Sequence, residues 1–187
     1  MEEDLKTAIE ILKKGGVILY PTDTIWGIGC DATNSEAVKR VYEIKKRADN
    51  KAMLVLLDNE NNLSKYVTDV PEMAYTLMEI SEKPVTIIYE GAYNLAPELM
   101  DEDNSVGIRI SQELFSKELC KRFRKPIVST SANVSGEPSA STFKGISKEI
   151  KESVDYIVKY RQDDNEKHIA SSVIKLSKDG TIKILRP

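Results

Sequence analysis

The fold is decided by a short apolar run between a pair of glycines and a polar loop, and the stretch reads Gly15-Gly16-Val17-Ile18-Leu19-Tyr20-Pro21-Thr22-Asp23-Thr24. The two glycines end a helix that is predicted from Glu3 to Lys14 by apolar residues at helical spacing. The run from Val17 to Tyr20 is typical of a buried strand, and Pro21 ends it. A helix followed at once by a buried strand is the repeating unit of an α/β protein.

The same alternation of helix and strand continues to the end of the chain. Periodicity predicts helices over Ser35–Lys46, Pro71–Ile80 and Glu113–Phe123, and strands over Met53–Leu57, Val85–Tyr89, Val106–Ile110 and Ile127–Val128. Shorter elements complete the set at Ser147–Ile150, Tyr156–Val158, Val173–Leu176 and Ile182–Leu185. We therefore expect an α/β fold with some antiparallel pairing toward the C-terminus, in a single domain over residues 1–187.

Composition and charge exclude several classes of protein. The 187 residues are 41% hydrophobic and 30% charged, which suits a folded chain with a core. With 27 basic against 30 acidic residues the net charge is −3, whereas a protein that holds nucleic acid by charge alone is usually basic. Two cysteines and one histidine exclude a zinc finger or a disulfide framework, and we expect the histidine, His168, to be solvated in its charged loop.

The sequence gives no sign of a membrane segment or a secretory signal. Its longest apolar run, Ala52 to Leu57, is far shorter than the roughly 20 residues that span a bilayer. The first residues after Met1 are acidic, where a secretory signal is basic. We expect a cytoplasmic protein in which Cys30 and Cys120 stay reduced.

Two polar segments that follow apolar strands are candidate ligand sites, because α/β proteins bind ligands at the ends of their strands. One is the loop from Pro21 to Gly29, where hydroxyls and glycines allow either a close approach to a small polar ligand or an ordinary tight turn. The other runs from Ser129 to Gly136 and consists mostly of Ser, Thr and Asn. Its hydroxyls and amide groups either bind an anion or form a turn, and we favour the anion site.

A third candidate is the cationic cluster of Lys45, Lys46, Arg47 and Lys51 at the end of the second predicted helix. Cations at a helix C-terminus are stabilised by the helix dipole, so a solvated cap is one interpretation. The other is a phosphate clamp, because arginine offers a planar fork and lysine a point charge.

In this order and spacing, the three segments resemble the YrdC-type threonylcarbamoyl-AMP synthase family over nearly the whole chain, in the single-domain form. The glycine-rich start matches the family from Gly15 to Thr24 and again from Gly27 to Ala32. The family's K-x-R motif matches Lys45-Lys46-Arg47, and its S-x-N motif matches Ser131-Ala132-Asn133. Arg109, after Val106-Gly107-Ile108, and the final Leu185-Arg186-Pro187 also fit the family pattern.

The resemblance implies a fold and a reaction. The fold is a twisted mixed parallel and antiparallel sheet flanked by helices, with a large concave cavity. The reaction joins L-threonine, bicarbonate and ATP, with Mg²⁺, into threonylcarbamoyl-AMP and pyrophosphate. A separate transferase complex then carries the threonylcarbamoyl group to an adenosine of tRNA. Direct contact of this chain with tRNA is a weaker expectation.

The resemblance also implies which residues would form the site. L-threonine would be held by Thr24, Arg109, Ser129 and Ser171. The ATP side would be lined by Lys45, Arg47, Lys51, Ser105, Ser131, Asn133, Ser139 and Arg186. The catalytic set would be Lys45, Arg47, Ser131 and Asn133, which would act by positioning and by charge rather than through a general base.

Two other functions are open on the same fold: an RNA-binding or ribosome-maturation factor, and a carbamoyl-transfer paralogue with another acceptor. The net charge argues against the first, although a basic pocket on an acidic surface could still bind RNA. This chain also departs from the pattern at Leu56, where some relatives carry a histidine that helps to hold threonine. That contact must be absent or replaced here.

Overall fold

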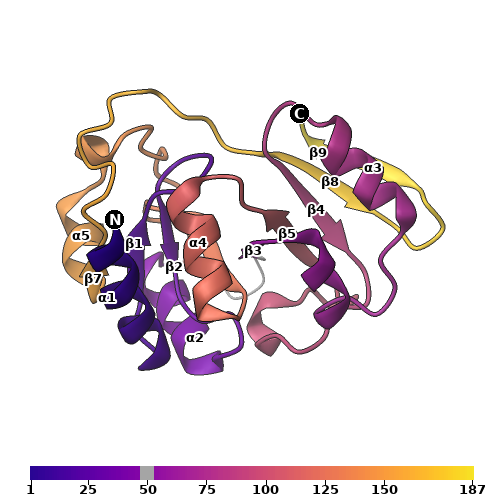
Figure 1. Ribbon diagram of the computed structural model, residues 1–187, viewed down its shortest axis with the longest axis horizontal. Coiled ribbons are helices and arrows are strands. Elements are labelled where there is room, and N and C mark those ends of the chain that lie inside the picture. The colour runs from indigo at the N-terminus through magenta and orange to yellow at the C-terminus, as the bar shows by residue number, and fades with distance from the viewer. Residues whose placement is uncertain (47–52) are drawn as a thin grey trace.

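The computed structural model describes residues 1–46 and 53–187 (Figure 1). The α-helices are α1 (Glu2–Lys13), α2 (Ser35–Ile44), α3 (Glu72–Ile80), α4 (Leu114–Phe123) and α5 (Lys148–Ser153). Short 3₁₀ turns are η1 (Glu60–Lys65), η2 (Pro97–Leu99) and η3 (Phe143–Gly145). The strands are β1 (Ile18–Tyr20), β2 (Gly27–Gly29), β3 (Leu54–Leu57), β4 (Val85–Tyr89), β5 (Val106–Ile110), β6 (Ile127–Ser131), β7 (Tyr156–Ile157), β8 (Ser172–Leu176) and β9 (Ile182–Arg186).

The strands form one mixed sheet in the order β7-β1-β2-β6-β3-β5-β4-β8-β9. Three of the strand pairs are parallel, namely β1 with β7, β3 with β5, and β4 with β8. The remaining neighbours are antiparallel. The predicted mixed α/β sheet is confirmed, and its strand order brings together segments that lie far apart in the sequence.

Two parts of the predicted strand pattern were wrong. Gly27 to Gly29 was interpreted as part of a polar loop, but it forms β2 between β1 and β6. The strand predicted over Ile127–Val128 continues through the hydroxyl residues to Ser131. Both differences have the same consequence, because they place polar or small residues within the sheet itself rather than in a loop beyond its edge.

Helices α1 and α4 lie together in front of the strands in Figure 1. On α1, the apolar stripe that predicted the helix is buried, with Leu5, Ala8 and Leu12 at most 1% exposed. Helix α2 begins at Asn34, whose side chain accepts a hydrogen bond from the N–H of Ala37, a common N-cap. None of the described helices has the length and the apolar character that a bilayer span requires.

A long connection, residues 158–171, leads from β7 to β8 (Figure 1). In the view of Figure 1 it passes over the top of the molecule, from the side of α1 and α5 to the side of α3 and β9. We call this connection the strap. It matters for the site because its last residue, Ser171, lines the cavity described below.

The start of the strap is fastened to α1 by a buried carboxylate. Asp4 accepts hydrogen bonds from the hydroxyl of Tyr156 at 2.7 Å, from the N–H of Lys159 at 2.9 Å and from the N–H of Tyr160 at 3.2 Å. Burial alone would raise the pKa of Asp4, but these hydrogen bonds outweigh it and lower the pKa below 3.8. Burial and the bond to Asp4 raise the pKa of Tyr156 to about 12.

Asp4→Ala is expected to lower the free energy of unfolding at pH 7 by roughly 2–3 kcal/mol, because two backbone N–H groups lose a charged acceptor. Since the folded-state pKa of Asp4 is depressed, its contribution is present above the unfolded value near 3.8 and is lost as the pH falls below it. Urea unfolding of both proteins at pH 7 and at pH 3 measures this. A stability difference that does not shrink at pH 3 would contradict the assignment.

Candidate active site

One face of the sheet carries a cavity of about 280 Å³. Its floor comes from alternate residues of neighbouring strands, as expected when successive side chains of a strand point to opposite faces. These floor residues are Thr86 and Ile88 of β4, Gly107 and Arg109 of β5, and Ser129 and Ser131 of β6. On β4 and β5 the residues between them, Ile87 and Ile108, are buried in the apolar core. On β6 the residue between them is Thr130, which is buried and also lines the cavity.

Around this floor the cavity is completed by residues from both ends of the chain. The loop after β1 and the start of β2 contribute Thr24, Ile25, Trp26 and Gly27. The remaining lining residues are Met53, Leu54, Asp101, Thr130, Ser139, Ala170, Ser171, Val173 and Arg186. In the part of the chain that the structure describes, the cavity therefore combines several hydroxyl groups with two arginines and one carboxylate.

All four residues predicted to hold L-threonine line this cavity: Thr24, Arg109, Ser129 and Ser171. The hydroxyl of Ser171 lies 2.8 Å from that of Thr86, and the backbone carbonyl of Ser171 accepts a hydrogen bond from Nε of Arg186 at 2.7 Å. Burial lowers the pKa of Arg186, and the nearby positive charge of Arg109 lowers it further. Two cations therefore share one cavity, which suits an anionic ligand.

Arg109 is almost completely buried, with 3% of its side chain exposed, and its partner is Asp23 of the loop after β1. Nε of Arg109 lies 3.0 Å from Oδ1 of Asp23, whose side chain is 7% exposed. Despite the short distance, neither Nε nor the two oxygens of Asp23 makes a hydrogen bond within the described residues. The two groups thus form a buried ion pair whose N–H is not aimed at its acceptor.

The loop that carries Asp23 and Thr24 is held by its own hydroxyls. Oγ1 of Thr22 donates to the carbonyl of Ile25 at 2.8 Å, accepts from the N–H of Thr24 at 3.1 Å and lies 3.0 Å from the hydroxyl of Thr24. Beyond the loop, Trp26 packs against Phe143 with ring centroids 4.8 Å apart. Trp26 is therefore a packing residue that also forms part of the cavity wall.

Three of the residues predicted for the ATP side, Ser131, Ser139 and Arg186, also line the cavity. Arg47 and Lys51, also predicted for this side, lie outside the described residues. Ser105 is buried behind the cavity, where its hydroxyl is 3.5 Å from Oδ2 of the lining residue Asp101. Ser131, Ser139 and Arg186 therefore line the same cavity as Ser171.

Lys45 does not line the cavity, and its surroundings differ from both interpretations of the cationic cluster. The residue is 1% exposed, so it is not a solvated helix cap. Its Nζ donates to the carbonyl of Ser131 at 2.5 Å and to the carbonyl of Asn133 at 2.8 Å. Lys45 therefore ties the end of α2 to the segment that carries the S-x-N motif.

Asn133, the other end of that motif, also holds the backbone rather than facing the cavity. Its Nδ2 donates to the carbonyls of Val134 at 3.0 Å and Glu137 at 2.6 Å. Its Oδ1 accepts a hydrogen bond from the hydroxyl of Ser139 at 3.4 Å. Through this contact Asn133 orients Ser139, which does line the cavity.

Among the lining residues that sequence reasoning did not assign to the site are Thr86, Asp101 and Gly107. It also did not assign Asp23, the ion-pair partner of Arg109. Thr86 could have been found, since it alternates with two apolar residues on a predicted strand. Gly107 leaves the floor open, because a Cβ there would approach Cγ2 of Thr86 to 3.3 Å and Cβ of Leu54 to 3.4 Å. Asp23 and Asp101 carry no local signal, since their roles depend on partners that are distant in sequence.

Leu56, the position at which some relatives carry a histidine, does not line the cavity. It is completely buried and lies opposite Arg109 in the parallel pairing of β3 with β5. An apolar side chain at this place packs beside Arg109 and offers no polar contact to a ligand.

The strap is anchored near the site by Arg161. Its Nη1 donates to the carbonyl of Thr22 at 3.3 Å and lies 3.5 Å from the carboxylate of Glu113. Its Nη2 lies 2.7 Å from Oδ2 of Asp164 and 2.9 Å from Nε2 of His168. The hydrogen bond from Arg161 lowers the pKa of Asp164 to about 2.

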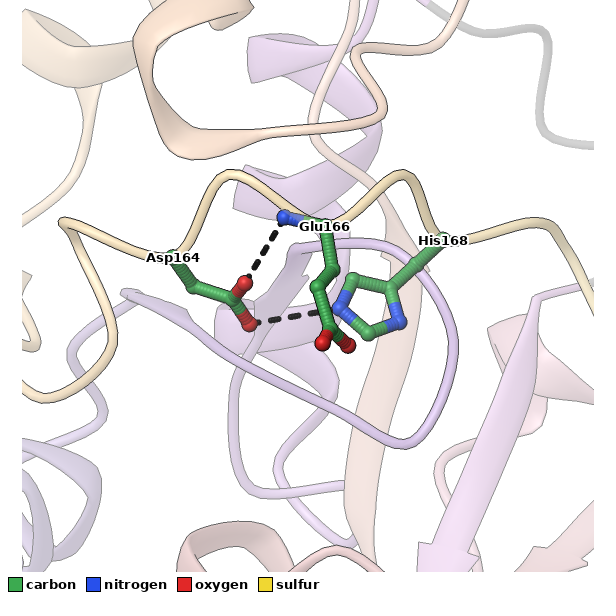
Figure 2. A group of neighbouring side chains, drawn as sticks. All are labelled: Asp164, Glu166 and His168. Atoms are coloured by element: carbon green, nitrogen blue, oxygen red, sulfur yellow. Dashed lines mark hydrogen bonds and ion pairs between the residues drawn. The ribbon is translucent and has the colours of Figure 1, made fainter.

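Figure 2 shows Asp164, Glu166 and His168 together on the strap. By ligand type these three side chains could hold a metal ion. However, Arg161 already contacts the same atoms of Asp164 and His168, so we assign this group to fastening the strap. His168 was expected to be solvated, and this was wrong, since only 27% of its side chain is exposed and Asp164 lies 3.3 Å from its Nε2.

Comparison with known proteins gives the family of the chain. The Sua5_yciO_yrdC family model, described as telomere recombination, matches residues 10–187. A threonylcarbamoyl-AMP synthase of Pseudoalteromonas translucida is 32% identical over 160 residues, which cover 84% of this chain and 86% of that protein. A putative threonylcarbamoyl-AMP synthase of Methanocaldococcus jannaschii is 34% identical over 188 residues, which cover 98% of this chain and 87% of that protein.

Solved structures show the same fold. E. coli YciO superimposes with a TM-score of 0.83 at 25% identity, over 100% of this chain and 89% of that one. P. abyssi Sua5, crystallised with L-threonine, superimposes with a TM-score of 0.87 at 22% identity. This chain spans 54% of that longer Sua5 chain, so the second likeness concerns the fold alone. Because the family model covers nearly the whole sequence and two relatives exceed 30% identity, the chain belongs to the Sua5/YciO/YrdC family.

Proposed function

We propose that this protein is an L-threonylcarbamoyladenylate synthase, an ATP-dependent nucleotidyltransferase that forms threonylcarbamoyl-AMP and pyrophosphate from L-threonine, bicarbonate and ATP. The observation that carries the proposal is the buried Arg109 in a cavity that also holds the hydroxyls of Thr24, Ser129 and Ser171. A guanidinium can bond both oxygens of a carboxylate, and hydroxyls can bond the rest of a small polar amino acid. Relatives named threonylcarbamoyl-AMP synthase support the same activity.

In this proposal the reaction needs positioning more than a dedicated base. The free amine of threonine attacks carbon dioxide and gives a carbamate with loss of a proton, or it attacks bicarbonate and gives the same carbamate with loss of water. A carbamate oxygen then attacks the α-phosphate of ATP in line, and pyrophosphate leaves. Because the carbamate is labile in water, a cavity set into the sheet protects it while the two substrates are held together.

The nucleotide would lie toward Ser131, Ser139 and Arg186. Arg186 and the hydroxyls would stabilise negative charge on the phosphates as pyrophosphate departs. Lys45 and Asn133 would act from outside the cavity, by fixing the backbone that carries Ser131 and the hydroxyl of Ser139. On this view the two motif residues are positioning residues rather than direct phosphate ligands.

ATP brings Mg²⁺ with it, and the cavity has a group that suits this ion. Mg²⁺ prefers oxygen ligands and is usually bound through one or two carboxylates together with the phosphates of the substrate. Asp101 is the carboxylate among the described lining residues, and we assign it to this role. When bound, Mg²⁺ would supply neutralisation of the phosphate charge.

The product would pass to a transferase that acts on tRNA, and we place the reaction in the cytoplasm. Cys30 and Cys120 are free thiols buried in the core, in keeping with a reducing compartment.

The test is pyrophosphate release by the purified protein with ATP, Mg²⁺ and bicarbonate, with and without L-threonine. We expect release that depends on L-threonine, and a product in the quenched mixture with the mass of threonylcarbamoyl-AMP. ATP binding without any release would contradict the proposal and indicate a paralogue that kept the pocket but not the chemistry. Release that depends on another amine would indicate a carbamoyl-transfer relative with a different acceptor.

A second hollow favours the alternative of RNA binding. It measures about 280 Å³, lies beyond the end of β3, and is lined by Leu57, Asp58, Asn62, Lys65, Tyr66, Lys121, Arg124 and Lys125. Four cations against one carboxylate could bind phosphates of RNA, and such binding weakens steeply with salt. A salt-dependent shift of tRNA in the absence of ATP, together with no pyrophosphate release, would favour this function over the synthase.

A further inference from the structure

Unsatisfied buried polar atoms are concentrated at a single place in the described residues. Four buried side-chain atoms have no hydrogen-bond partner there: both carboxylate oxygens of Asp23, Nε of Arg109, and Oε2 of Glu98. Three of the four thus belong to one ion pair at the edge of the cavity. Because buried polar groups are nearly always hydrogen-bonded, such a concentration requires an explanation.

The geometry of the pair indicates which partner can move. Asp23 is carried by a loop that is fixed by the hydroxyl of Thr22 and, from the strap, by Arg161. Arg109 projects from β5, an interior strand of the sheet, on a long side chain with several rotatable bonds. Alignment of the Nε–H with Oδ1 therefore requires a small rotation of the guanidinium, over a distance that is already only 3.0 Å.

We infer that Asp23 is a positioning residue for the amino-acid substrate and acts through Arg109. This inference rests on the proposed function, in which Arg109 binds the carboxylate of L-threonine. When that carboxylate takes one edge of the guanidinium, it fixes the plane of the group, and Nε–H then donates fully to Asp23. Hydrogen bonds in an empty site are often poorly aligned and tighten only when the ligand binds.

The sign of the effect separates this role from simple charge balance. If Asp23 only neutralised Arg109, its removal would strengthen the attraction of Arg109 for a carboxylate and lower the KM for L-threonine. If the Asp23–Arg109 hydrogen bond forms only in the complex, its loss weakens the complex and raises that KM. The two roles therefore predict changes of KM in opposite directions.

The experiment compares wild type, Asp23→Asn and Asp23→Ala by pyrophosphate release and by calorimetric binding of L-threonine. We expect the KM for L-threonine to rise at least tenfold in Asp23→Ala, with an intermediate rise in Asp23→Asn, because the amide oxygen still accepts a bond but carries no charge. The KM for ATP should change less than twofold in both. This split between the two substrates is not expected from general damage to the fold.

Asp31→Asn is the matched control. Asp31 is equally buried, with 6% of its side chain exposed, and lies 2.6 Å from Nζ of Lys125; unlike Arg109, Lys125 does not line the cavity. Its variant should leave the KM for L-threonine unchanged. An unchanged or lower KM in the Asp23 variants would overturn the inference alone. A wild-type protein that neither binds nor uses L-threonine would overturn the proposed function, and the inference with it.

Discussion

Arg109→Ala is expected to raise the KM for L-threonine by two to three orders of magnitude, while the KM for ATP changes little. Two charge-assisted hydrogen bonds to a carboxylate are lost, which together are worth roughly 3–4 kcal/mol. The side chain is 3% exposed, so water cannot replace it well. Steady-state pyrophosphate release with each substrate varied in turn measures both constants. A rise in the KM for ATP alone would contradict this and indicate that Arg109 contacts the nucleotide instead.

The same substitution should also destabilise the protein, because it leaves Asp23 as a buried charge without its partner. Breaking a buried pair in this way costs about 3–5 kcal/mol. The double variant Asp23→Ala/Arg109→Ala removes the orphaned charge, so it should recover much of the stability but none of the affinity for L-threonine. Arg122→Ala is the matched arginine control, since Arg122 lies on the surface and pairs with Glu2 and Glu118.

Lys45→Met is expected to lower the free energy of unfolding by roughly 2–4 kcal/mol, although methionine fills the space of the lysine stem. The buried ammonium group donates to the carbonyls of Ser131 and Asn133, and hydrogen bonds to a charged donor are worth about 1.5–3 kcal/mol each before the cost of burying the charge. Because these carbonyls flank the nucleotide side of the cavity, the KM for ATP should rise as well.

Urea unfolding and pyrophosphate release with varied ATP measure the two effects of Lys45→Met. Lys39→Met is the control on the same helix, because Lys39 is 52% exposed and its nearer acidic partner, Glu36 at 2.9 Å, is 84% exposed. We expect it to change the unfolding free energy by at most about 0.5 kcal/mol. If Lys45→Met unfolds at the same urea concentration as wild type, Lys45 does not anchor the segment from Ser131 to Asn133.

The long apolar elements of the fold were predictable, because burial leaves a periodic signal in the sequence. Strand β2 was not, since glycine is rare in strands and Gly27-Ile28-Gly29 reads as a loop. The reason for glycine there is tertiary: a Cβ on Gly29 would collide with the carbonyl oxygen of Val128 on one side and the ring of Tyr20 on the other. No local pattern reveals such a close approach of two strands.

Several residues that line the candidate site could be named from the sequence, but their roles could not. The resemblance to the family implied that Thr24, Arg109 and Ser171 belong to one site, and all three line the cavity. The family motifs did not distinguish Ser131, which lines the cavity, from Lys45, which is buried and binds the backbone carbonyls of Ser131 and Asn133. That distinction depends on burial and on backbone acceptors across the sheet. Likewise, the role of Asp23 depends on its contact with Arg109 of β5, which is distant in sequence.

The strand order has a consequence for how the protein reaches its native state. Strand β7 pairs with β1 and strand β8 with β4, so long stretches of chain must close before these contacts form. Proteins with many such non-local pairings fold more slowly than helical bundles of similar size. The cavity draws on Thr24 near one end of the chain and Arg186 near the other, so a partly folded chain, however compact, has no complete binding site. Ligand binding during refolding therefore measures the fraction of chains that have reached the native state.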